Sequence, residues 1–255
     1  MDKKNSFIGG IETFDELDEG GNPVGKDMGN LFFTSDLHFN SRKFLDYRRD
    51  VRWNDTRGQS QIGPNKHLSP ISLFRDVLSV QEMNQVIMDS WNQVVGDRDT
   101  VIVVGDFYHQ VDGWGSTTLD MLMYGLNGKK VLIIGNHDHN GVGHHSGWLD
   151  RVPDLMLKQK DLVEYGNVQR KVPGPGMNLY VHHYPSMCRG FMTREDERNF
   201  YLNVHGHVHG NYGPVWSIHN FLMFDVCFDT HLAPVGIDDI WRMSVEYARR
   251  NMAVA

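Results

Sequence analysis

The sequence predicts an α/β fold. Three short apolar runs, at residues 30–35 (NLFFTS), 100–105 (TVIVVG) and 131–135 (VLIIG), are typical of strands that are covered on both faces. A long helical pattern lies between the first two runs, and a shorter one lies between the second and the third. Strands that alternate with helices in this way indicate a parallel sheet with helices packed on it.

The clearest helix is predicted over residues 79–95. Ser79 and Glu82 have the spacing of a capping box, in which each residue satisfies a backbone N–H of the other. Apolar residues recur at helical spacing, at Met83, Val86, Ile87, Trp91, Val94 and Val95. Gly96 is expected to end the helix in a left-handed conformation. We interpret the apolar stripe as core and not as a cofactor site.

The remaining elements are shorter. A helix is predicted over residues 116–124, closed by Gly125 and Gly128, and a C-terminal helix is predicted over about residues 238–250. Three later strands are predicted at residues 178–181, 201–204 and 221–228.

A single domain is predicted over residues 30–255, with insertions at about residues 41–80 and 139–176. Residues 1–29 are polar, acidic and rich in glycine, which favours an N-terminal arm or an added hairpin. The 41–80 insertion is expected to be irregular. Its cationic side chains include Arg42, Lys43, Arg48, Arg49, Arg52 and Arg57. We interpret them as a solvated charged surface, with a contact to a phosphate-bearing substrate as the alternative.

Composition excludes some classes of protein. The formal net charge of −7 disfavours binding to long nucleic acids, which usually requires a basic surface. No apolar run approaches the roughly 18 residues of a membrane span, and the first residues lack the apolar region of a signal peptide. The two cysteines, Cys188 and Cys227, are far apart and more typical of buried thiols than of a disulfide. We expect a cytoplasmic protein without a membrane partner, and leave its oligomeric state open.

Histidine is the unusual residue, with fourteen in the chain. Many of them belong to short motifs that each follow a predicted strand. In order, the motifs are Asp36-Leu37-His38, Gly105-Asp106, Gly135-Asn136-His137-Asp138, His182-His183-Tyr184-Pro185 and Gly206-His207-Val208-His209. Ligands bind at the carboxyl ends of strands in open α/β sheets, so we expect these motifs to meet at one edge.

The side chains in these motifs suit two adjacent divalent metal ions. Imidazole, carboxylate and amide groups without a thiolate favour Mn²⁺, Fe or Zn²⁺ over a structural zinc site. Asp36 and His38 share a face after the strand, and Asp106 can bridge two ions because a carboxylate has two oxygens. Two ions about 3.5–4 Å apart suit the hydrolysis of phosphate esters. His137, next to the amide of Asn136, is the natural proton donor to the leaving oxygen.

Taken in order, D-x-H, G-D, G-N-H-D, H-Y-P and G-H-x-H resemble the calcineurin-like metallophosphoesterases. The resemblance runs from about residue 31 to residue 240, and it is closest to small bacterial and phage phosphoesterases over FTSDLHF, EMNQVIMDSWNQVVGDRDTVIVVGDF and VLIIGNHD. It implies a four-layer αββα sandwich, in which helices flank two packed mixed β-sheets. One departure is that relatives often have H-F-G-H where this chain has His38-Phe39-Asn40-Ser41. That difference puts an auxiliary substrate contact in doubt and leaves the metal ligands intact.

The resemblance also implies a role for each site residue. Asp36, His38 and His209 would bind the first metal ion, and Asn136, His183 and His207 the second, with Asp106 bridging. His137 would be the acid or transition-state stabiliser, and Asp138 would orient a neighbouring group. Two divalent ions are expected, Mn²⁺ first, with Fe, Zn²⁺ or Ni²⁺ as alternatives.

The predicted function is therefore metal-dependent hydrolysis of a phosphomonoester or phosphodiester by attack of a metal-bound hydroxide. The substrate would be a small phosphate ester or a nucleotide, and its identity is not encoded in any motif. A nuclease or cyclic-nucleotide phosphodiesterase is the alternative with the same chemistry, and a non-catalytic metal-binding interaction scaffold is the alternative of another class. A protein phosphatase is disfavoured because the G-D-x-x-D-R-G signature is absent after Gly105.

Other histidines are less informative. His182 and His205 neighbour ligands along presumed strands and should point to the opposite face. His109 is three residues beyond Asp106 and is open to a place in the pocket, the core or the surface. A substrate contact also remains open for three residues in later loops, His144, His145 and Arg189.

Overall fold

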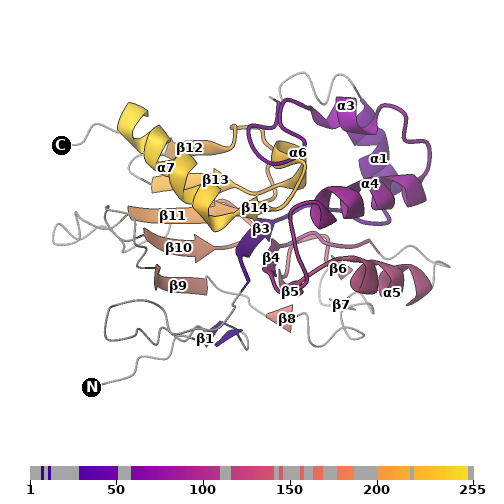
Figure 1. The fold of residues 1–255 in the computed structure, drawn as a ribbon, viewed down its shortest axis with the longest axis horizontal. Helices are drawn as coiled ribbons and strands as arrows, with labels where there is room; N and C mark the ends of the chain where they lie inside the picture. The colour runs from indigo at the N-terminus through magenta and orange to yellow at the C-terminus, as the bar shows by residue number, and fades with distance from the viewer. Residues whose placement is uncertain are drawn as a thin grey trace.

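The architecture was analysed in a computed structural model of the chain. The structure describes residues 29–50, 59–109, 116–140, 177–186, 200–218 and 221–251, and the strand backbones at 7–8, 11–12, 144–145, 156–157 and 163–168. It is a mixed α/β fold built on two five-stranded sheets (Figure 1).

The first sheet has the strand order β14-β3-β4-β5-β8. Its strands are β3 (Leu31–Thr34), β4 (Thr100–Val104), β5 (Lys129–Ile133), β8 (Met156–Leu157) and β14 (Val235–Gly236). Strands β3, β4, β5 and β8 are parallel, and β14 pairs with β3 in the antiparallel sense. The three strands predicted from apolar runs form the centre of this sheet, whereas its two-residue edge strands are too short to show a pattern.

The second sheet has the strand order β12-β13-β11-β10-β9. Its strands are β9 (Val163–Val168), β10 (Met177–Val181), β11 (Phe200–His205), β12 (Val215–Ile218) and β13 (Phe221–Asp225). Strands β10, β11 and β13 are parallel, and antiparallel strands close both edges. Two small antiparallel hairpins complete the strands: β1 (Phe7–Ile8) with β2 (Ile11–Glu12), and β6 (His139–Asn140) with β7 (His144–His145).

Six helices lie within the described part of the chain. They are α1 (Arg42–Arg49), α3 (Pro70–Phe74), α4 (Val80–Asn92), α5 (Ser116–Gly125), α6 (Phe228–His231) and α7 (Ile237–Asn251). None of these helices has the length and apolar character that crossing a membrane requires.

Helix α4 confirms the predicted capping box and corrects the predicted end. The Ser79 hydroxyl accepts from the backbone N–H of Glu82 at 3.2 Å, and the Glu82 carboxylate accepts from that of Ser79 at 3.0 Å. The helix ends at Asn92, and Gly96 does not adopt the left-handed conformation that we predicted. The backbone N–H of Gly96 donates to the Asp99 carboxylate at 2.7 Å, so a side chain and not a left-handed glycine completes this turn.

Alternate residues of the central strands enter two different parts of the core. Val101 and Val103 of β4 pack toward α4 and α5, whereas Ile102 and Val104 pack with residues of the second sheet. The two sheets therefore pack face to face, with helices over the outer face of the first. Helix α7 contacts β12 and β13 of the second sheet and β3 and β14 of the first. A complete fourth layer stays a prediction.

The 41–80 insertion is partly helical, not irregular. Ser41 accepts from the backbone N–H of Phe44 and begins α1, whose buried face includes Phe44, Leu45 and Arg48. The interpretation as solvated surface holds for Arg42, which is exposed and paired with Asp46 at 3.1 Å. The interpretation is wrong for Arg48. This side chain is fully buried, and its charge is paired with the buried carboxylate of Asp229. Arg52 and Arg57 lie outside the described residues.

The predicted strand at residues 221–228 is also too long. Strand β13 ends at Asp225, whose carboxylate accepts from the backbone N–H of Cys227 at 2.8 Å and from that of Gly210 at 2.7 Å. These bonds turn the chain, and α6 begins at Phe228.

The two sheets are joined at the carboxyl ends of their strands. Ser35, directly after β3, pairs with Cys227, directly beyond β13. The backbone N–H of Ser35 donates to the carbonyl of Val226 at 3.0 Å, and Ser35 accepts from Phe228 at 2.9 Å. This junction brings the loops that follow both sets of parallel strands to one place.

Candidate metal centre

The backbone is strained where the predicted ligands lie. Eight described residues other than glycine have a positive φ, and five of them are predicted ligands. These five are Asp36 (φ 55°), His38 (48°), Asp106 (56°), His207 (70°) and His209 (49°). A positive φ is uncommon for residues with a side chain, and such strain concentrates at functional sites.

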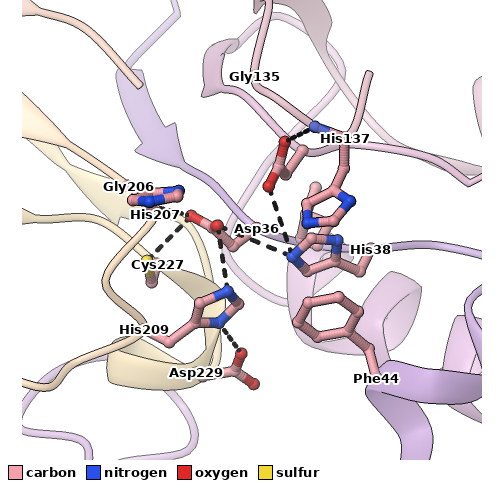
Figure 2. Close-up of polar contacts among 12 residues, drawn as sticks. Asp36, His38, Phe44, Gly135, His137, Gly206, His207, His209, Cys227 and Asp229 are labelled. Atoms are coloured by element: carbon pink, nitrogen blue, oxygen red, sulfur yellow. Dashed lines mark hydrogen bonds and ion pairs between the residues drawn. The ribbon is translucent and has the colours of Figure 1, made fainter. Parts of the chain in front are cut away.

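Three of the predicted ligands form one donor group. Asp36 Oδ1 lies 3.3 Å from His209 Nε2 and 3.8 Å from His38 Nε2 (Figure 2). Asp36 and His38 are fully buried, and among the residues that the structure describes neither Asp36 Oδ1 nor His38 Nε2 has a hydrogen-bond partner. An unpaired buried polar atom costs about 1–3 kcal/mol, so the absence of a partner at two facing atoms fits a cation between them.

A second donor group follows β5, β10 and β11. Asn136 Oδ1 lies 2.8 Å from His183 Nε2 and 3.0 Å from His207 Nδ1. The carboxylate of Asp106 lies 3.5 Å from His183 Nε2. Asp36, Asp106 and His183 also offer donor atoms that all lie within 4.8 Å of one another, so the two groups are adjacent.

Asp106 connects the groups through one oxygen. Its Oδ2 lies 3.7 Å from His38 Nε2 and 3.5 Å from His183 Nε2. Its Oδ1 accepts from the backbone N–H of His137 at 2.8 Å. We predicted a bridge that uses both oxygens. That bridge stays a prediction, and Oδ2 is the oxygen that approaches a histidine of each group.

Three of the four histidines that are predicted ligands are oriented by a contact on the far side of the ring. The Nδ1 atoms of His183, His209 and His38 lie 2.8 Å from the Val104 carbonyl, the Asp229 carboxylate and His109 Nε2, respectively. Each contact leaves Nε2 facing the other donors, which is the usual arrangement around a protein-bound metal. His207 differs, since it faces Asn136 through Nδ1.

The charges of the site are strongly coupled. Burial disfavours the charged form of His183, but its hydrogen bond to Asp106 and the charges of Asp36 and Asp106 outweigh burial and raise its pKa to about 9. Burial and the neighbouring histidines hold the pKa of His38 well below its ordinary value. The carboxylates therefore hold a proton on His183, and a divalent cation would have to displace that proton.

His137 lies beside the donor groups with an exposed side chain. Its ring centroid is 5.3 Å from that of His38 and 5.1 Å from that of His109. Its backbone N–H is fixed on Asp106, whereas its imidazole is not part of either donor group (Figure 2).

Asp138 lies beneath the site and is fully buried. Its Oδ2 accepts from the backbone N–H groups of Asp106 and Gly135, both at 2.8 Å, and its Oδ1 accepts from that of Phe107 at 2.9 Å. Burial and the charge of Asp106 raise the pKa of Asp138 to about 7. These contacts hold two ligand turns together, and they suit an orienting role more than a contact with substrate.

Two motif glycines allow the ligands to approach closely. A Cβ on Gly206 would collide with the Asp36 carboxylate and the Ser35 hydroxyl, and a Cβ on Gly135 would collide with Asp106. The glycines of G-H-x-H and G-N-H-D are thus required by space at the centre of the site.

Several supporting residues carried no clear signal in the sequence. His109, whose position was left open, reaches His38. Cys227 donates its thiol to Asp36 Oδ2 at 2.9 Å, and burial together with the charges of Asp225 and Asp36 raises its pKa well above the usual value. The sulfur therefore keeps the proton that it donates. Cys188 lies outside the described residues.

The remaining expectations have mixed outcomes. His182 contacts Tyr184 and Ser186, and His205 contacts Trp216, so neither belongs to a donor group. Asn40 has a φ of 64°, which explains how it can stand where relatives have glycine. His144 and His145 are described only as backbone in β7, and Arg189 lies outside the described residues.

Comparisons with known proteins give distant likenesses. No family model matches the chain. The Gene 66 protein of Mycobacterium phage D29 is 27% identical over 196 residues, covering 71% of this chain and 79% of that protein. The Gene 66 protein of Mycobacterium phage L5 is 26% identical over 202 residues, covering 71% and 78%. An uncharacterised protein of Methanocaldococcus jannaschii is 28% identical over 114 residues, covering 45% and 49%.

Two solved structures are also similar. One is a protein of unknown function from Aquifex aeolicus, at 18% identity and a TM-score of 0.46, covering 84% of this chain and 99% of that chain. The other is a predicted phosphoesterase from Streptococcus pneumoniae, at 12% identity and a TM-score of 0.28, covering 77% and 71%. Similarity at these levels does not establish a family, so the function has to be argued from the site.

Proposed function

We propose that this chain is a phosphoesterase that uses two divalent metal ions to hydrolyse a phosphomonoester or phosphodiester. The observation that carries the proposal is the pair of buried, unpartnered donor atoms, Asp36 Oδ1 and His38 Nε2, within a larger set of converging ligands. When bound, the ions would supply Lewis acidity and an activated water. The nitrogen and oxygen donors suit Mn²⁺, with Fe, Zn²⁺ or Ni²⁺ as alternatives.

The ligands divide between the two ions as the donor groups do. Asp36, His38 and His209 would hold the first ion, and Asn136, His183 and His207 the second. Asp106 Oδ2 would lie between them, since it approaches a histidine of each group. This division is the one that the resemblance to calcineurin-like metallophosphoesterases implies, and the same resemblance supports a four-layer αββα arrangement.

His137 is proposed to protonate the leaving oxygen or to stabilise charge in the transition state. Its exposed imidazole lies near His38 of the first donor group, with ring centroids 5.3 Å apart, and its backbone N–H donates to the Asp106 carboxylate. Asp138 would keep this turn in register with the turn that carries Asp106. A small phosphate ester or a nucleotide fits this chemistry, and a nuclease or a cyclic-nucleotide phosphodiesterase would use the same residues.

The test is a parallel assay of a chromogenic phosphomonoester and phosphodiester after removal and replacement of metal. The purified protein is treated with a chelator and then supplied with Mn²⁺, Zn²⁺, Ni²⁺ or Mg²⁺. We expect the chelator to abolish hydrolysis and Mn²⁺ to restore it. Metal-loaded protein that hydrolyses neither ester would contradict the proposal and favour a non-catalytic scaffold.

The His137→Ala variant tests the role of the imidazole. Loss of a general acid typically lowers turnover by about 10²–10⁴-fold, and the bound metal should be unchanged because His137 is not a ligand. His67→Asn is the matched control, since His67 is exposed, lies outside both donor groups and has a positive φ that asparagine tolerates. Equal turnover of His137→Ala and the control would remove His137 from the mechanism.

A further inference from the structure

We propose that Arg48 and Asp229 are positioning residues that orient the donor group formed by Asp36, His38 and His209. The inference rests on the metal centre proposed above. It assigns a role to a buried ion pair that lies outside every motif of the site.

Arg48 donates to three oxygen acceptors in the interior of the protein. Its Nε lies 2.7 Å from Asp229 Oδ1, its Nη2 lies 2.9 Å from the Asp36 carbonyl, and its Nη1 lies 3.1 Å from the Leu37 carbonyl. The guanidinium also lies over the rings of Phe74 and Phe228, 5.3 and 5.5 Å from their centroids. Arg48 thus holds the backbone of the D-x-H turn, in which both ligands have a positive φ.

Asp229, the partner of Arg48, also orients His209, the third member of the donor group. Its Oδ2 lies 2.8 Å from His209 Nδ1, on the side of the ring away from the other donors (Figure 2). A carboxylate can only accept, so the proton of neutral His209 is held on Nδ1. The lone pair of Nε2 then faces Asp36 Oδ1, 3.3 Å away.

The ion pair joins three separate parts of the fold. Arg48 lies on α1 in the 41–80 insertion, Asp36 follows β3 of the first sheet, and Asp229 lies on α6 after β13 of the second. Burying an ion pair has a large desolvation cost, and apolar replacements are often neutral or stabilising. This pair contacts the backbone of Asp36 and the ring of His209. Its role is therefore more in positioning these two side chains than in stabilising the fold.

Two variants separate geometry from charge. In Asp229→Asn, the single amide oxygen can accept from Arg48, and the amide NH₂ then faces His209 Nδ1. That contact favours the tautomer with the proton on Nε2, the nitrogen that would bind metal. Arg48→Lys keeps the charge but loses the planar fork that reaches three acceptors. Arg42→Lys is the matched control, because Arg42 is an exposed arginine of the same helix whose carboxylate partner is also exposed.

The experiment titrates metal-free wild type and variants with Mn²⁺ by calorimetry, and records the His209 ring nitrogens by NMR. We expect two ions in the wild type. Asp229→Asn should weaken one of them by about 10–100-fold, the usual cost of losing the partner of a ligating histidine, and leave the other unchanged. The His209 signals of metal-free Asp229→Asn should report the changed tautomer. Arg48→Lys should weaken the binding of the same ion, and Arg42→Lys should leave the binding of both ions unchanged.

The outcomes distinguish this inference from the proposed function. Wild type that binds no Mn²⁺ contradicts the metal centre itself. Wild type that binds two ions, with Asp229→Asn binding both at unchanged affinity or keeping the wild-type tautomer, overturns the positioning role alone. Equal weakening of both ions would overturn the assignment to one group. If Asp229→Asn does not fold, Arg48→Lys decides: wild-type affinity for both ions in that variant also overturns the inference.

Discussion

The two donor groups differ in how deeply they are built into the fold. In the group of Asp36, His38 and His209, two members are fully buried and the third has a side chain that is 13% exposed. In the group of Asn136, His183 and His207, only His183 is buried. Tyr184, 42% exposed, lies edge-on to His207 at 4.6 Å between centroids. The second group is thus the more exposed of the two.

The supporting contacts follow the same division. In the first group, Asp36 accepts a hydrogen bond from the Cys227 thiol, His38 contacts His109, and His209 contacts Asp229. In the second group, His183 is held by the Val104 carbonyl, and the contact of His207 with Asn136 is exposed. One ion would therefore be bound as part of the core, where a substitution changes both the geometry of the site and the stability of the fold. The other would be bound at a surface, where they can be changed separately.

The largest effect is expected at the residue that the two groups share. Asp106→Asn keeps the shape of the side chain but removes the charge of Oδ2, which approaches a histidine of each group. We expect loss of both ions, and a fall in turnover of about 10³-fold or more, because each ion contributes several kcal/mol to the transition state. Metal content and turnover measure the result, with exposed Asp46→Asn as control. Retention of both ions at wild-type affinity would show that Asp106 does not connect the groups.

A paired substitution tests whether burial separates the groups. His207→Ala should weaken one ion and change the free energy of unfolding of the metal-free protein by no more than about 0.5 kcal/mol, as at most exposed positions. His38→Ala should weaken the other ion and also lower the free energy of unfolding by roughly 1–3 kcal/mol, because it removes a buried ring stacked on Phe44. Urea unfolding and Mn²⁺ titration measure both effects. Equal changes in stability would remove the proposed difference.

The same division explains what could be predicted from sequence. The strands before Asp36, Asp106 and Asn136 are continuous apolar runs that can be recognised from the local sequence, and each predicted ligand lies two or three residues after its strand. Contacts between distant segments have no such signature. Arg48 is 181 residues from Asp229, and Cys227 is 191 residues from Asp36, so neither partner is visible locally. For this reason Arg48, which lies in a polar stretch of sequence, was predicted to be on the surface, although its charge is paired with Asp229 in the interior.

Side-chain competition explains the smaller errors. Gly96 has the position of a left-handed helix end, but the Asp99 carboxylate completes the turn instead. The short strands β8, β12 and β14 owe their conformation to pairing with neighbours and not to their own two to four residues. A sequence pattern indicates the conformation that a segment prefers by itself. In these segments, hydrogen bonds to other residues determined the conformation instead.

The last expected effect is a pH dependence of the free energy of unfolding that only the metal-free protein should show. The pKa of His183 is raised from its ordinary 6.5 to about 9 in the folded state. A raised histidine pKa contributes stability that is complete below the unfolded value and is lost as the pH rises through the folded one. The free energy of unfolding should therefore fall between about pH 6.5 and 9. With Mn²⁺ bound, the ion takes the place of the proton, and this slope should disappear.

The upper part of this window separates His183 from Asp138 and Cys227, and His183 shares it with His209, whose pKa is also raised above its ordinary value. Asp138 has a pKa of about 7, so its titration is largely complete at higher pH, and the Cys227 thiol titrates well above 9. His183→Gln, measured in the same urea series, should reduce the slope in the metal-free protein, and the slope that is left belongs to His209. A metal-free wild type with constant stability from about pH 7 to 9 would show that the carboxylates of Asp106 and Asp36 do not hold a proton on His183. The expectation that a metal ion displaces a proton from His183 would then be wrong.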